Sequence, residues 1–97
     1  MYTVNSIIAL EPYNGLKVKK ITSESQSEII FISLEKGAVF PKHTSPKDAN
    51  LIVLEGEIAF HINEKEYVLF DQQHFQFEKE VSHWVKANDN SKFLIIR

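Results

Sequence analysis

The sequence predicts a single all-β domain that closes into a small barrel. Short apolar runs are separated by polar or glycine turns at intervals of roughly 8–12 residues, a spacing typical of sandwiches and barrels. The length of 97 residues is close to the commonest domain size and leaves room for one core. No internal repeat or linker divides the chain, so residues 1–97 are expected to form one domain.

Nine runs rich in apolar and β-branched residues are expected to be strands. They are residues 16–22, 28–34, 38–40, 50–54, 58–62, 67–70, 75–77, 81–87 and 92–96. The first two are joined by a polar turn over residues 23–27. The third ends at Pro41, because proline cannot donate a hydrogen bond within a central strand. A polar loop over residues 42–48 follows.

The next two strands form a hairpin, with Glu55 and Gly56 at its turn and alternating side chains in its second arm. Residues 63–66 turn the chain again. The sequence Asn-Asp-Asn at residues 88–90 sets up the final strand.

Residues 67–84 also allow a helical interpretation. Tyr67, Phe70, His74, Phe77, Val81 and Trp84 recur at spacings of three and four, which would line one helix face. Other apolar side chains, such as Val68 and Val85, would lie off that face, and no convincing N-cap precedes it. We therefore predict strands here.

Composition excludes several classes of function. The net charge is −2, with basic and acidic residues interspersed, which argues against a nucleic-acid partner. No cysteine is present, so thiolate sites and disulfides are excluded, and three glycines cannot build a phosphate-binding loop. The chain has no signal-like start and no apolar run of 18 residues, so we expect a cytoplasmic protein without a membrane partner.

Histidines and glycines mark the most informative part of the chain. Gly37, His43 and Gly56 fall on three positions of the pattern G(x)5HxH(x)3,4E(x)6G. His83 falls on the histidine of a second pattern, G(x)5PxG(x)2H(x)3N. Through these residues the chain resembles the cupins, with a degenerate form of their metal-binding motifs.

The resemblance covers residues 37–97 and includes the hairpin sequence VLEGEIAFHI at residues 53–62. It implies a cupin-type double-stranded β-helix, also called a jelly-roll barrel. It also implies that His43 and His83, forty residues apart in sequence, meet inside the barrel.

The same patterns would normally supply His, His, Glu and His to one divalent metal. Here the second histidine position is Ser45 and the glutamate position is Ala49. His43 and His83 remain as metal ligands, and two imidazoles would hold Zn, Mn, Fe or Ni only weakly, because stable sites use three or four protein ligands. Asp48, His61 and His74 are candidates for a further ligand.

Without a metal, the two histidines are suited to bind a small anion or polar molecule, or to move a proton near neutral pH. The ligand pocket that the resemblance implies contains His43, Ser45, Ala49, Leu51 and His83.

Two large aromatic residues and one further histidine have other expected positions. His61 alternates with inward Phe60 and Ile62, so it is expected to face solvent or an interface. Trp84 and Phe75 are expected in the core or in dimer packing, with a pocket wall as the alternative.

Three functions therefore stay open at the level of sequence. The first is binding of a small polar molecule, with or without a weakly held metal. The second is a metal-dependent cupin enzyme of dioxygenase, isomerase or lyase type, with an unrecognised third ligand. The third is a structural or regulatory homodimer without catalysis, because Ile52 and Leu54 make the second face of their strand apolar.

Overall fold

The computed structural model describes residues 1–24 and 27–97. Within them the chain forms one short helix and nine strands. These are α1 (Ile7–Leu10), β1 (Leu16–Lys20), β2 (Ile29–Leu34), β3 (Val39–His43), β4 (Ala49–Glu55), β5 (Glu57–Ile62), β6 (Lys65–Phe70), β7 (His74–Phe77), β8 (His83–Ala87) and β9 (Ser91–Ile96). The all-β prediction is confirmed. The turn predicted over residues 23–27 includes residues 25–26, which lie outside the described residues.

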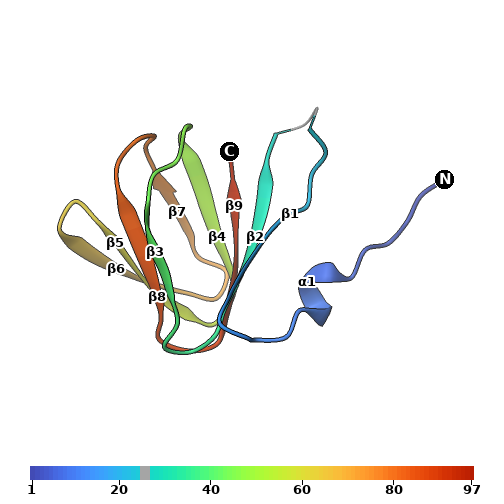
Figure 1. The fold of residues 1–97 in the computed structure, drawn as a ribbon, viewed down its shortest axis with the longest axis horizontal. Helices are drawn as coiled ribbons and strands as arrows, with labels where there is room; N and C mark the ends of the chain where they lie inside the picture. Colours follow the sequence, from blue (N-terminus) through green and yellow to red (C-terminus); the bar gives the residue numbers. More distant parts are fainter. Residues whose placement is uncertain (25–26) are drawn as a thin grey trace.

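The strands form two antiparallel sheets that face each other. One has the order β1-β2-β9-β4-β7 and the other the order β3-β8-β5-β6. Figure 1 shows these sheets as two walls, with α1 outside them on the side of β1 and β2. This is the predicted jelly-roll architecture. Residues 67–84, which allowed a helical interpretation, supply β6, β7 and the start of β8.

The core lies between the sheets and follows the alternation of the strands. In β4, for example, Leu51 and Val53 are fully buried while the residues between and beside them are less so. Phe60 of β5 and Phe93 of β9 are the largest fully buried side chains of this core. Burying such side chains gives roughly 1.5–3 kcal/mol each, which makes apolar burial the main source of stability.

The N-terminal segment lies against the outer side of the five-stranded sheet. The ammonium of Lys92, a side chain that is nearly buried, donates a hydrogen bond to the carbonyl oxygen of Ile8 (2.7 Å). Tyr13 donates one from its hydroxyl to the Glu55 carboxylate (2.7 Å). The homodimer expected from Ile52 and Leu54 stays a prediction, and part of the sheet face that carries them is already crossed by the chain itself.

The helix in this segment was not expected from the sequence. It has four residues and none of them is buried, and the Lys92 ammonium bonds to the carbonyl oxygens of Ile8 and Ala9 within it. Among the described residues, no helix has the length and apolar character needed to cross a membrane.

Strand β3 extends further than the sequence indicated. It continues through Pro41 to His43, because it is an edge strand and one side of its backbone needs no partner. The pairing of β3 with β8 shifts in register between Phe40 and His43. This irregularity places His43 opposite His83.

The tight turn between β4 and β5 gives a test of the fold. Gly56 has a φ of +103°, and a Cβ atom there would collide with the Ser91 side chain and the Asn90 carbonyl oxygen. We expect Gly56→Ala to lower the free energy of unfolding by about 2–4 kcal/mol, measured by urea denaturation.

Gly37→Ala is the matched control. Gly37 also has a positive φ, of +85°, but a Cβ there would meet no atom within 4 Å. We expect backbone strain alone to lower the free energy of unfolding of this variant by about 1–2 kcal/mol. Equal losses in the two variants would contradict the close approach at Gly56.

Candidate functional site

The two histidines are brought into contact by neighbouring strands. His43 of β3 and His83 of β8 are paired in register, and their ring centroids lie 4.3 Å apart at an interplanar angle of 70°. His83 is 1% exposed and packs against Phe60 and Phe77. His43 is half-buried and stacks on Phe40 at 4.1 Å. The pair therefore lies partly in the core.

Backbone hydrogen bonds determine which ring nitrogen carries the proton. His43 Nδ1 lies 2.6 Å from the carbonyl oxygen of Pro41, and His83 Nδ1 lies 2.9 Å from that of Val81. Because a carbonyl oxygen only accepts, both Nδ1 atoms are the donors. Each neutral ring then has its lone pair on Nε2. The Nε2 atom of His83 is buried and has no hydrogen-bond partner.

The last residue of the chain adds a positive charge to this region. Asn50 pairs with Ile96, so Arg97 follows opposite Ala49, on the side where Ile95 joins the core. The Nη1 atom of Arg97 donates a hydrogen bond to Ser45 Oγ (3.1 Å). Of the two residues that depart from the cupin ligand pattern, Ser45 is therefore bonded to this guanidinium.

Arg97 is held from two sides. Its Nη2 atom lies 3.6 Å from the Glu28 carboxylate, and the backbones of the two residues exchange two hydrogen bonds. Ser45 is 2% exposed and its hydroxyl donates to the carbonyl oxygen of Lys47 (2.6 Å). Ser45 Oγ is thereby left with lone pairs for Arg97.

These surroundings make His83 a weak base. Burial is the main cause that lowers its pKa, and the nearby His43 and Arg97 lower the pKa further. The hydrogen bond to the Val81 carbonyl acts in the opposite direction. His83 is therefore neutral at neutral pH.

The cupin resemblance implies a metal, and the donors present do not fit one. Two Nε2 lone pairs are available, but no group of three or more His, Cys, Asp or Glu side chains in residues 1–24 and 27–97 is placed to hold a metal ion. The Arg97 charge adds repulsion for a divalent cation. Structural and catalytic transition-metal sites use three or four protein ligands.

The other candidate ligands lie elsewhere or are already bonded. Asp48 accepts a hydrogen bond from the backbone N–H of Lys79 (2.9 Å). His61 stacks on Trp84, with ring centroids 3.7 Å apart, on the outer face of the four-stranded sheet. His74 is exposed, and its Nε2 donates to Asn50 Oδ1 (2.7 Å).

The five residues of the expected ligand pocket do not line one common cavity. Ser45, Leu51 and His83 are buried. Ala49 is also buried, and it lines a cavity of about 470 Å³ between β7 and the β5–β6 hairpin. Neither histidine lines that cavity.

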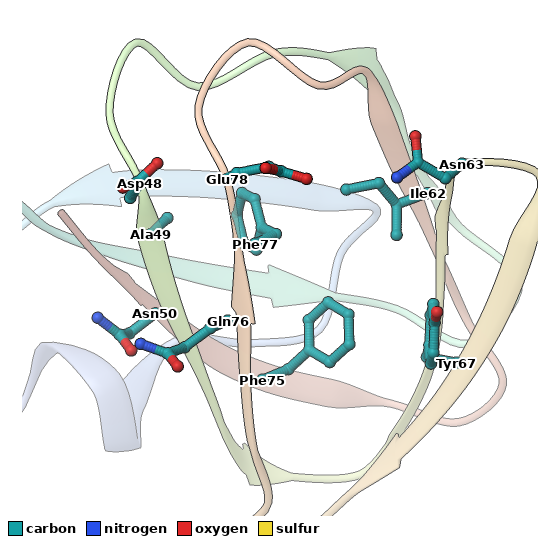
Figure 2. A pocket seen from close by; sticks show the side chains of 10 residues that line it. All are labelled: Asp48, Ala49, Asn50, Ile62, Asn63, Tyr67, Phe75, Gln76, Phe77 and Glu78. Atoms are coloured by element: carbon teal, nitrogen blue, oxygen red, sulfur yellow. The ribbon is translucent and has the colours of Figure 1, made fainter.

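The cavity has an apolar wall and a polar rim (Figure 2). Its apolar and aromatic residues are Ala49, Ile62, Tyr67, Phe75 and Phe77, and its polar residues are Asp48, Asn50, Asn63, Gln76 and Glu78. In Figure 2 the Glu78 carboxylate extends from the end of β7 toward Asn63 on the opposite side. The cavity is thus shaped by the edge strands of the two sheets, β7 and β6.

A second cavity of about 440 Å³ lies beside the outward stack of His61 and Trp84. Its lining includes Lys42, Glu64 and Lys65. Trp84 thus belongs to a pocket wall and to a stack on the outer face, outside the core. Phe75 lines the first cavity and packs on Phe60 at 4.9 Å.

Sequence reasoning missed Arg97 and the cavity residues of the hairpin. No motif marks the last residue, although the alternation of Ile95 inward and Ile96 outward would have placed Arg97 inward. Asn63 and Tyr67 were considered only as turn and strand residues. Their role depends on how close β6 comes to β7, which no local pattern reveals.

The burial of His83 predicts how stability depends on pH. The folded pKa is lowered from the ordinary value of 6.5, so the unfolded chain binds a proton more readily than the folded one. Stability from this group is complete above pH 6.5 and is lost as the pH falls, by at most about 1.4 kcal/mol per pH unit. NMR titration of the His83 ring should give a midpoint below 6.5. A midpoint above it would contradict the neutral, buried ring.

Several solved structures have the same fold. An RmlC-like cupin protein from Desulfovibrio desulfuricans matches with a TM-score of 0.84 and 16% identity, covering 99% of this chain and 95% of that one. A cupin superfamily protein from Desulfitobacterium hafniense matches with a TM-score of 0.81 and 15% identity, covering 89% of this chain and 79% of that one. A conserved protein of unknown function from Streptococcus pyogenes matches with a TM-score of 0.77 and 20% identity, covering 99% of this chain and 93% of that one. At these identities the similarity shows the fold alone.

A comparison with curated proteins finds no match. The sequence itself carries a family signature over most of its length. The family model described as "Cupin domain" matches residues 30–96, from the second strand to the last. This chain therefore belongs to the cupin family.

Proposed function

We propose that this cupin binds a small polar molecule in the cavity between β7 and the β5–β6 hairpin, and that it does so without a resident metal. The cavity is the observation that carries the proposal. Its volume of about 470 Å³ is in the range of small-molecule sites, which combine an apolar wall with a few polar groups. Phe75 and Phe77 supply such a wall, and Asn63 and Gln76 supply hydrogen-bonding groups.

The site differs from the pocket implied by the motif residues. Ala49 is common to both, and the hydrogen-bonded neighbour of Ala49 in the sheet is Phe77, which also lines the cavity. Phe77 in turn contacts the His83 ring at 4.6 Å. The ligand would therefore lie next to the histidine pair, with Phe77 between them.

The metal-free part of the proposal rests on Arg97. A guanidinium is always charged and has five N–H donors in a fixed plane. Here it bonds to Ser45, one of the two positions at which metal ligands are replaced. A divalent ion bound by His43 and His83 would be repelled by this fixed positive charge. Only two protein ligands would be present to offset that repulsion.

The proposal is tested by NMR titration of ¹⁵N-labelled protein with erythritol, glucose, n-butylammonium and butyrate. We expect at least one of these probes to shift the backbone amides of Asn63, Gln76 and Glu78 in a saturable way. Glu78→Trp should abolish these shifts, because Figure 2 shows the Glu78 side chain extending toward Asn63, and an indole there would fill the space between them.

Glu66→Trp is the matched control. Glu66 is paired with His61, which faces outward, and it does not line the cavity. Binding should survive in this variant. Shifts confined to His61 and Trp84, or no saturable shift with any of the probes, would contradict the proposed site.

A further inference from the structure

We propose that the polar molecule bound in this cavity is an organic cation with a small ammonium group. The inference rests on the proposed function, because it concerns the same cavity, and it adds the sign of the ligand's charge. It is carried by the charge of the cavity lining, in which Asp48 and Glu78 are the charged residues, together with the rings of Tyr67 and Phe75 that line the same cavity (Figure 2).

The aromatic corner is formed by the edges of the two sheets. Tyr67 of β6 and Phe75 of β7 have ring centroids 5.1 Å apart and planes inclined by 45°. Phe60 of the core lies behind Phe75 at 4.9 Å and supports it. Tyr67 is 38% exposed and lines the cavity. The face of an aromatic ring attracts an ammonium group within about 6 Å of the centroid.

The acceptors needed by an ammonium group are on the same rim. Within the described residues, no hydrogen bond or ion pair engages the Glu78 carboxylate, and it points toward Asn63. Asp48 has one carboxylate oxygen bonded to the Lys79 backbone N–H, which leaves the other oxygen free. An ammonium group has three donors and no acceptor, so carboxylate and amide oxygens suit it.

The charge of the lining excludes the opposite class of ligand. Asp48 and Glu78 are the charged residues among those that line the cavity, and no Lys, Arg or His is found in this described lining. A carboxylate or phosphate would meet two negative charges without a basic partner. A neutral polyol would leave both charges uncompensated, whereas a cation offsets one of them.

Three probes of similar size test how binding depends on the charge of the ligand. They are n-butylammonium, n-butanol and butyrate, which carry positive, neutral and negative polar ends. In ¹⁵N NMR titrations we expect n-butylammonium to bind about tenfold more tightly than n-butanol, because the carboxylates and the ring faces of the cavity attract a positive charge. Butyrate should bind most weakly.

Two substitutions assign the effect to the named residues. Glu78→Gln should weaken n-butylammonium binding about three- to tenfold and leave n-butanol unchanged, since only the charge is removed. Tyr67→Leu should also weaken n-butylammonium selectively, because it keeps an apolar side chain without a ring face. Glu66→Gln, the same charge change on the outward side of β6, should alter neither affinity.

The outcomes distinguish the two proposals. Equal affinity for n-butanol and n-butylammonium, tighter binding of butyrate, or equal effects of Glu66→Gln and Glu78→Gln would overturn the cationic ligand and leave binding in the cavity intact. Binding of erythritol or glucose at the cavity, with none of n-butylammonium, would do the same. No cavity shift with any probe would overturn both.

The source of the ammonium group is tested with Nα-acetyl-lysine amide. This probe has the same butylammonium side chain on an uncharged backbone. Affinity equal to that of n-butylammonium would support a lysyl side chain as the natural ligand. Weaker affinity would support a free amine. Both results agree with an ammonium site.

Discussion

The hydrogen bonding of β9 between β2 and β4 is the constraint on which the rest of the molecule depends. Strand β9 is the central strand of its sheet and pairs with β2 on one side and with β4 on the other. Phe93 and Ile95 join the core on one side of this strand, and Lys92 anchors the N-terminal segment on the other. Arg97, which follows this strand, bonds to Ser45 and pairs with Glu28.

This position of Arg97 gives the barrel a fixed positive charge next to two imidazoles. The guanidinium is anchored by Ser45 and Glu28, and it contributes to the lowered pKa of His83. The His83 ring packs on the aromatic ring of Phe60, and its Nε2 atom has no hydrogen-bond partner. Because the ring is neutral, it can be buried in the packed interior. We propose that the ligand is recognised by the carboxylate and aromatic residues between β7 and β6, and not by the histidine pair.

The fold was predictable from sequence because alternation along each strand matches its burial, as Leu51 and Val53 in β4 illustrate. The family was predictable because Gly37, His43, Gly56 and His83 keep their spacing. The cavity was not, because Tyr67 and Glu78 come together only through the meeting of two sheet edges. The structure brings His43 and His83 together, and their binding of any ligand stays a prediction. Helix α1 was not predictable because it has four residues, none of them buried, which is too short for a periodic pattern.

Calorimetric titration with Zn²⁺, Mn²⁺, Fe²⁺ and Ni²⁺, on protein freed of metal, tests the central claim most directly. As a positive control, the combined variant Ser45→His, Ala49→Glu and Arg97→Met restores four ligands and removes the competing charge. We expect no saturable binding to the unmodified chain and clear binding to this variant. Tight binding of one metal ion per unmodified chain, lost on His43→Ala, would contradict it.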